Sequence, residues 1–205
     1  IHATPKGDEL VAYMARVSNP ENQDNPDSAR LISYLIKHKH WSPFEMVGAC
    51  VEINTTRDIA RQILRHRSFH FQEFSQRYAD ASLLGDMVER ECRMQDVKNR
   101  QNSTACEDEA MQHQFTASQN QLWKHATSVY QMALSFGIAK EQARALLPEG
   151  LTPSRMYMHG TLRDWIHYIE VRTDQSTQKE HRLIAQAIAD VLRVEFPAVF
   201  AAVAI

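Results

Sequence analysis

Apolar residues recur at helical spacing along much of the chain, with shorter apolar runs and turn-rich segments between them. The most regular stripe consists of Leu183, Ile184, Ala187, Ile188, Val191 and Leu192. Such spacing predicts helices over residues 7–17, 28–36, 57–67, 116–136, 140–147, 161–172 and 177–192. Strands are predicted over residues 2–5, 46–54 and 151–159, and residues 69–74 are typical of extended chain. Because helices and strands do not alternate as regular βαβ units, the pattern predicts an α+β fold: a small, mainly antiparallel sheet packed with several long helices.

Local signals define individual helix ends. Thr161 and Asp164 match a capping box, so a helix should begin there. Gly137 is expected to end the longest helix, whose seam should be Leu122, Ala126, Val129, Ala133 and Phe136. Residues 82–110 are rich in charged and amide side chains; they predict a surface excursion, with a strand near 88–94 and no assigned chemistry.

Composition narrows the class of protein. A chain of 205 residues with 43% hydrophobic content predicts one domain over residues 1–205 with a sizeable core. No apolar run is long enough for a membrane span and no leader is visible, so we expect a cytoplasmic protein without a membrane partner. The three cysteines, Cys50, Cys92 and Cys106, show no CxxC spacing, which favours reduced thiols and no metal site.

Charge and glycine content exclude several binding modes. The net charge of −2 argues against a broad nucleic-acid-binding face. Six glycines without GxGxxG or GxxxxGK[ST] exclude a Rossmann or P-loop unit. The excess of 16 arginines over 7 lysines points instead to recognition of planar anions.

The polar chemistry is concentrated between Arg65 and Arg77. On the predicted helix, Arg57, Arg61 and Arg65 are spaced at i, i+4 and i+8, where like charges cost about 0.2–0.5 kcal/mol per pair. Such a face requires anions opposite it, either the protein's own carboxylates or the phosphates of a ligand. The simpler interpretation is a solvated basic helix that leads into a half-buried strand. The adjacent carboxylate, hydroxyl, amide and guanidinium groups favour a phosphate-bearing small molecule instead.

The order Arg65-His66-Arg67, seven residues, Ser75, one residue, Arg77 resembles the signature of the flavin-dependent thymidylate synthases. Residues 140–148 and 160–182 resemble two further motifs of that family, and residues 38–45 resemble a segment near its flavin and folate. The resemblance implies reductive methylation of dUMP to dTMP, with methylene-tetrahydrofolate as carbon donor and hydride from FAD that NADPH reduces. It also implies a homotetramer with active sites shared between subunits.

The resemblance assigns residues to three roles. The positions implied to bind dUMP are Gln62, Arg65, Glu73, Ser75, Gln76, Arg77, Arg144 and Arg172. The positions implied to bind FAD are Ser42, Glu45, Arg65, His66, Arg67, Gln72, Glu73, Thr161, Arg163, His167 and Ser176. The positions implied to be catalytic are Arg172, Ser75 and His40, with Arg172 polarising the pyrimidine ring.

Several of these residues have simpler interpretations. His38 and His40 fit a helix end better than a metal site, and Arg144 could form an intrahelical pair with Glu141. Ser75 lacks the GxSxG context of a hydrolase nucleophile, so the resemblance gives it a binding role in a mechanism without covalent attack by the enzyme.

The sequence departs from the commonest family pattern at four flavin positions: Gln72, Thr161, His167 and Ser176. The side chains at these positions are still polar, but they differ in length from the usual ones and so in the distance over which they can contact a flavin. The enzyme interpretation predicts a yellow protein that releases the hydrogen from carbon 5 of dUMP. One alternative is an arginine-rich nucleic-acid-binding module, which predicts colourless protein and steeply salt-dependent binding. The other is a structural helical protein, which predicts neither the enzyme's properties nor nucleic-acid binding.

Overall fold

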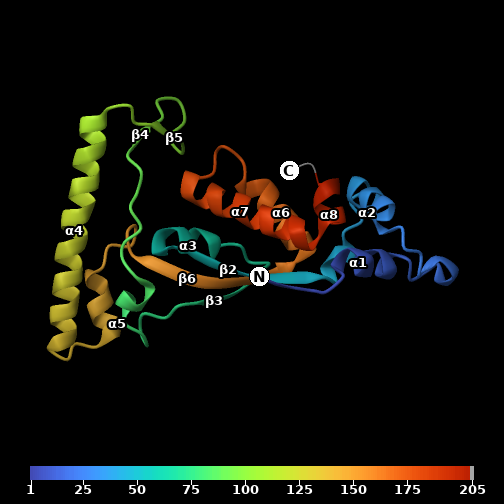
Figure 1. Cartoon of the computed structure of the whole chain (residues 1–205), viewed down its shortest axis with the longest axis horizontal. Helices are drawn as coiled ribbons and strands as arrows, with labels where there is room; N and C mark the ends of the chain where they lie inside the picture. Colours follow the sequence, from blue (N-terminus) through green and yellow to red (C-terminus); the bar gives the residue numbers. More distant parts are fainter. Residues whose placement is uncertain (204–205) are drawn as a thin grey trace. The chain divides into compact units, whose positions relative to one another are not determined.

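The computed structural model describes residues 1–203 and shows a mixture of helices and strands (Figure 1). The strands are β1 His2–Ala3, β2 Gly48–Thr56, β3 His70–Glu73, β4 Arg93–Gln95, β5 Ser103–Ala105 and β6 Pro153–Thr161. The α-helices are α1 Gly7–Ala15, α2 Ser28–Lys37, α3 Arg57–Ile63, α4 Glu109–Ser135, α5 Lys140–Ala143, α6 Leu162–Arg172, α7 Lys179–Glu195 and α8 Pro197–Ala202. The elements follow no βαβ alternation, which confirms the predicted α+β class.

Two sheets are present within residues 1–203. The larger has the strand order β1-β2-β6-β3, with β1 antiparallel to β2 and His2 opposite Cys50. The smaller is the antiparallel hairpin of β4 and β5. Neither contains a Rossmann or P-loop unit. In this described part of the chain, no helix combines the length and apolar character that a membrane span requires.

Residue contacts divide the chain into two compact units. Unit 1 consists of Ile1–Glu52, His66–Phe71 and Tyr157–Ile205, and unit 2 consists of Ile53–Arg65 and Gln72–Met156. Strands β2, β3 and β6 contribute residues to both units. Unit 1 therefore contains most of the predicted flavin residues and unit 2 most of the predicted nucleotide residues.

The core of unit 1 is built around α6. Its capping box forms as predicted: Asp164 Oδ2 accepts the Thr161 N–H at 2.9 Å, and Thr161 Oγ1 accepts the Asp164 N–H at 3.3 Å. The apolar face predicted for this helix is buried, and the Trp165 indole N–H donates to Ala49 O at 3.1 Å. A Cβ at Gly160 would lie 2.5 Å from the Phe69 ring, so only glycine permits this close approach.

Helix α7 buries a face that only partly coincides with the predicted stripe: Ile188 and Leu192 are buried as predicted. Its buried residues are His181, Ala185, Ile188, Ala189 and Leu192. Leu183 is 52% exposed and Val191 38% exposed, so these members of the predicted stripe lie outside the core. A further short helix, α8, which the sequence pattern did not predict, packs against α7 and α2.

The long helix of unit 2 begins earlier than predicted. Asp108 caps α4 by accepting the Met111 N–H at 3.1 Å, so the helix begins at Glu109, seven residues before the expected start at residue 116. Gly137, at φ 79°, ends it as predicted. The predicted seam is wrong at Leu122 (51% exposed) and Phe136 (74% exposed). The face that is buried contains Gln119, Ala126, Tyr130 and Ala133.

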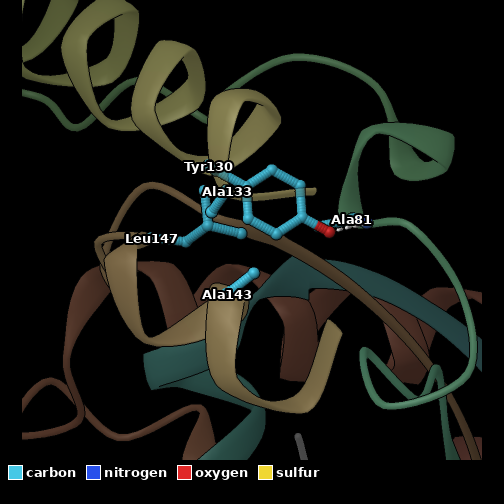
Figure 2. Close-up of a cluster of buried hydrophobic side chains, with 5 residues drawn as sticks. All are labelled: Ala81, Tyr130, Ala133, Ala143 and Leu147. Carbon is cyan, nitrogen blue, oxygen red and sulfur yellow. Dashed lines mark hydrogen bonds between the residues drawn. The ribbon is translucent and has the colours of Figure 1, made fainter. Parts of the chain in front are cut away.

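A small cluster packs α4 against neighbouring segments of unit 2. It consists of Ala81, Tyr130, Ala133, Ala143 and Leu147 (Figure 2). The Tyr130 hydroxyl accepts the Ala81 N–H at 3.2 Å, so the buried phenol has a polar partner.

The arginine helix is shorter than predicted. Helix α3 ends at Ile63, and the Arg65 N–H bonds to Gln62 O in a turn. The predicted stack of three arginines on one helical face is therefore wrong for Arg65, which the turn carries off the helix. Only Arg57 and Arg61 share the helix.

The excursion over residues 82–110 is tied to the rest of unit 2 by an unpredicted residue, Arg90. Its guanidinium donates to Gly150 O at 3.0 Å and to Asp58 Oδ1 at 2.6 Å. The strand expected over 88–94 is mostly wrong, because β4 begins only at Arg93. The Val88 N–H bonds to Leu151 O instead.

Candidate active site

Unit 2 contains a polar cavity of about 420 Å³ beside the first turns of α3 and the α5 region. Its lining residues are Arg57, Arg61, Gln76, Glu141, Arg144, Ala145, Leu147 and Glu149. Two of them, Gln76 and Arg144, belong to the predicted nucleotide set. The cavity combines guanidinium groups with one amide, which suits a phosphorylated ligand.

Three arginines near this cavity are paired with the protein's own carboxylates. Arg57 lies 3.5 Å from Glu73, Arg77 lies 3.3 Å from Glu141, and Arg61 pairs with Glu149. Ligand phosphates are therefore not needed to neutralise these three; of the two kinds of anion expected, the protein's own carboxylates are the ones present. The Arg61 and Arg77 pairs are largely exposed; such pairs contribute only about 0–1 kcal/mol, so a more highly charged phosphate can replace them.

Two polar groups of the predicted nucleotide set remain available for a ligand. Arg144 forms no carboxylate pair within residues 1–203; its Nε–H donates to Glu141 O at 3.2 Å. Gln76 is only 2% exposed, and its Nε2 has no hydrogen-bond partner among the described residues. Buried amides are nearly always satisfied, so an orphaned donor lining a cavity points to a missing partner. The helical pair between Arg144 and Glu141 uses the backbone carbonyl, not the carboxylate.

The remaining nucleotide residues of unit 2 lie on or near β3. Glu73 Oε1 accepts the Ser154 hydroxyl at 2.6 Å, so this carboxylate is fixed from two sides. Ser75 is half-buried, and its hydroxyl forms no hydrogen bond with any histidine in the described chain. Arg65 is exposed without a carboxylate partner there, and Gln72 is exposed on β3. Gln62 is half-buried on α3.

Unit 1 contains a larger cavity, of about 830 Å³, that holds three of the predicted flavin residues. Its lining residues are Ile36, Lys39, Trp41, Glu45, Ser68, Arg163, Asp164, Ile166, His167, Glu170, Ala202 and Val203. Arg163 pairs with Glu45. The cavity has the size of a cofactor site, apolar walls at Trp41 and Ile166, and cations at Lys39 and Arg163. The lining also includes the carboxylates of Glu45, Asp164 and Glu170, so it is the size and the apolar walls of the cavity that suit a flavin ring system.

Arg172, the predicted catalytic arginine, occupies the last turn of α6. Its Nε–H donates to His66 Nε2 at 2.9 Å, so His66 is neutral at that nitrogen and carries its proton on Nδ1. Within residues 1–203 Arg172 has no carboxylate partner. The structure thus joins one residue of the first motif to one of the third, and leaves the terminal nitrogens of Arg172 for a ligand. Arg67 is exposed, also without a carboxylate pair in that range.

The histidines at the end of α2 adopt a helix-terminal arrangement. His38 is the C-cap residue, and the His40 N–H bonds to Leu35 O at 2.9 Å. Their rings lie 6.1 Å apart, with Tyr34 stacked 4.3 Å from His38. No group of three potential metal ligands occurs in the described chain. The helix-end interpretation is confirmed for His38. Ser42 begins the following 3-10 helix and is exposed.

Two positions that depart from the family pattern are occupied by local contacts. Thr161 caps α6, and the Ser176 hydroxyl donates to Asp174 at 2.6 Å. The hydroxyl and the backbone N–H of Ser176 both donate to Asp174 and lower its pKa, which keeps the carboxylate charged. Both hydroxyls would have to exchange a protein contact to meet a flavin.

Two residues beside Arg172 were missed by sequence reasoning. Tyr168 and His181 are both fully buried, and the tyrosine hydroxyl lies 3.0 Å from His181 Nε2. The available signal was the position of His181 in the spacing 181, 185, 188 and 192, because a histidine in an apolar stripe needs a polar partner.

Comparison with known proteins agrees with this geometry. The family model described as "Thymidylate synthase complementing protein" matches residues 1–198. A flavin-dependent thymidylate synthase of Synechocystis is 52% identical over 202 residues, covering 97% of this chain and 89% of the relative. A probable flavin-dependent thymidylate synthase of Paramecium bursaria Chlorella virus 1 is 50% identical over 193 residues, covering 94% and 88%.

A solved structure is also similar. The UMP/dUMP methylase PolB of Streptomyces cacaoi, bound with 5-Br dUMP, superposes with a TM-score of 0.82 at 27% identity, covering 95% of this chain and 89% of that one. Together with the whole-length family match, these likenesses confirm the family suggested by the motif around Arg65: the chain belongs to the flavin-dependent thymidylate synthases.

Proposed function

We propose that this protein is an FAD-dependent thymidylate synthase that converts dUMP to dTMP, with methylene-tetrahydrofolate as the carbon donor. The observation that carries the substrate assignment is the unit 2 cavity, where, among the described residues, Gln76 Nε2 has no hydrogen-bond partner and Arg144 has no carboxylate partner. The binding of UMP or dUMP analogues by the similar methylase PolB supports a pyrimidine nucleotide as the ligand.

The phosphate end of dUMP would bind in the unit 2 cavity. Arg144 offers a fork that can hold two phosphate oxygens at once. Gln76 Nε2 would gain the acceptor that it lacks. Arg77 would turn from Glu141 to the nucleotide, since an exposed pair costs little to exchange. The remaining proposed nucleotide contacts come from Gln62, Arg65, Glu73 and Ser75.

Arg172 would act on the pyrimidine ring. Carbon 5 of uracil is a weak nucleophile, and it becomes reactive when the ring has enolate character, with negative charge shared between carbon 5 and a ring carbonyl oxygen. A guanidinium already held at Nε by His66, without a carboxylate pair of its own in the described chain, is suited to stabilise that charge. Ser75 would bind the nucleotide without attacking it. His40 would contribute to catalysis near the flavin.

The flavin would be held by residues of unit 1 and the first motif. Glu45, Arg163 and His167 line the 830 Å³ cavity and are the strongest candidates. The other proposed contacts are Ser42, Arg65, His66, Arg67, Gln72, Glu73, Thr161 and Ser176. When bound, FAD supplies the reducing equivalents for the methylation, which it receives from NADPH.

The working form would be a homotetramer in the cytoplasm, with active sites completed by neighbouring subunits. Support comes from the apolar side chains that α4 exposes in one chain, including Leu122, Met132 and Phe136, which are 51%, 51% and 74% exposed. They recur at the spacing of a helix–helix seam. A second copy of the chain would cover them.

The absorbance spectrum of the purified protein tests the cofactor assignment. We expect a yellow protein whose flavin bands bleach with NADPH, and which releases hydrogen from carbon 5 of dUMP when methylene-tetrahydrofolate is added. A colourless protein that binds RNA or DNA with a steep salt dependence would support the nucleic-acid-binding alternative instead.

A further inference from the structure

A buried chain of polar side chains lies directly behind Arg172. Arg172 donates to His66, and the His66 ring meets the Tyr168 ring edge-to-face with 4.9 Å between centroids. Tyr168 in turn is hydrogen-bonded to His181 at 3.0 Å. These residues come from separate segments of the chain: the loop after α3, the middle and end of α6, and the first turn of α7.

Packing fixes the rings of this chain. Phe69 lies edge-to-face against both Trp165 (4.7 Å between centroids) and Tyr168 (5.8 Å). Trp165, Tyr168 and His181 are all 0% exposed. Edge-to-face pairs at these distances are favourable beyond the area that they bury. The Tyr168 ring is therefore held from several sides, and His181 is held by its bond to the Tyr168 hydroxyl, while its Nδ1 has no hydrogen-bond partner among the described residues. Arg172 is only partly buried.

Electrostatics keep this network neutral apart from Arg172. Burial, followed by the nearby positive charge of Arg172, lowers the pKa of His181 to about 4. Burial raises the pKa of Tyr168 well above its ordinary value, so its hydroxyl stays protonated. Near pH 7 the guanidinium of Arg172 is therefore the one charge among Arg172, His66, Tyr168 and His181.

We propose that the Tyr168–His181 pair is a positioning device: it locks the ring of His66, which holds Arg172 at Nε and directs its terminal nitrogens at the pyrimidine. The inference deepens the proposed function and rests on it. A free arginine side chain at a helix end loses rotamer entropy when it is ordered on a substrate. A preset guanidinium avoids that loss when the substrate's charge develops.

The test compares Tyr168→Phe, His181→Gln and His181→Phe with wild type in the release of hydrogen from carbon 5 of dUMP. Misplacing a catalytic group by about 1 Å can cost up to ~100-fold in rate. We expect kcat to fall about tenfold or more in Tyr168→Phe and His181→Phe, with KM for dUMP within about threefold and flavin absorbance unchanged. His181→Gln should retain more activity than His181→Phe, because its amide can still bond to the Tyr168 hydroxyl.

A second readout does not depend on activity. In wild type the Arg172 Nε–H should give a slowly exchanging NMR resonance that shifts or broadens in Tyr168→Phe and His181→Phe. The matched control is Tyr13→Phe on α1, where the phenol is 45% exposed; it should change neither readout. Variants that lose thermal stability but keep kcat and the Arg172 resonance would overturn the inference. If wild type releases no hydrogen from dUMP, the proposed function fails. The Arg172 resonance alone then tests whether Tyr168 and His181 position Arg172.

Discussion

Arg61 and Glu149 form an ion pair on the lining of the unit 2 cavity, with both side chains about half exposed. The pair places a negative charge of the protein where a nucleotide phosphate is proposed to bind. An exposed pair of this kind contributes little to stability, so its carboxylate mainly opposes an incoming anion.

Replacing Glu149 with glutamine should therefore strengthen the binding of dUMP. Removal of the like charge leaves Arg61 free to contact the phosphate, and we expect Kd to fall about two- to fivefold, measured by calorimetry at low salt. The gain should shrink as salt is raised. Glu21→Gln, on an exposed segment of unit 1, is the matched control; equal tightening there would indicate a general charge effect instead.

Gln76→Leu should separate binding from stability. The Nε2 group of Gln76 is buried without a partner in the described chain, and leaving such a group unsatisfied costs about 1–3 kcal/mol. The variant should be at least as stable as wild type in urea unfolding without ligand, while its Kd for dUMP rises about tenfold. Weaker stability together with unchanged affinity would show that this amide serves the fold alone.

Ser75→Ala should weaken turnover without abolishing it. The Ser75 hydroxyl forms no hydrogen bond with a histidine in the described chain and so lacks an activating base. We expect kcat/KM to fall about 10- to 100-fold, with residual product detectable by chromatography. A dead variant that still binds flavin and dUMP normally would argue for a nucleophilic serine.

Stability should depend on pH through His181. The unfolded chain protonates this histidine below about pH 6.5, whereas the folded protein does so only near pH 4. Between these values the unfolded state binds more protons. The free energy of unfolding should therefore decrease as pH falls from 6.5 toward 4, by at most roughly 3 kcal/mol from this residue.

His181→Gln supplies the comparison. Urea unfolding of wild type and variant at several pH values between 4 and 7 should show a smaller loss in the variant, because glutamine does not titrate. Identical slopes for the two proteins would mean that His181 is protonated in the fold, or exposed.

The sequence predicted best the elements whose local and long-range signals agree. Helix α6 has a capping box and an apolar face, and both formed as expected. Helix α4 shows where such reasoning fails: Leu122 and Phe136 have the spacing of a core seam, but they lie on the exposed face. Periodicity identifies an apolar face without saying whether the same chain or another one covers it.

The candidate site was predicted where residues share a motif and missed where they meet through the fold. The motif around Arg65 identified His66, but its bond to Arg172 spans over a hundred positions in the chain. Tyr168, His181 and Arg90 belong to no motif, and only burial and partner geometry reveal them. Helix α3 ends earlier than predicted because the chain must turn before β3. Helical spacing alone does not indicate where that turn begins.

The proposed mechanism depends on guanidinium groups that the protein leaves for a nucleotide, and its most direct test is the release of tritium from carbon 5 of labelled dUMP. Purified protein supplied with NADPH and methylene-tetrahydrofolate should release the label, and Arg172→Ala should reduce that release by ~100-fold or more while its flavin spectrum persists. Release at the wild-type rate by Arg172→Ala, or none by a flavin-loaded wild-type protein, would contradict the account.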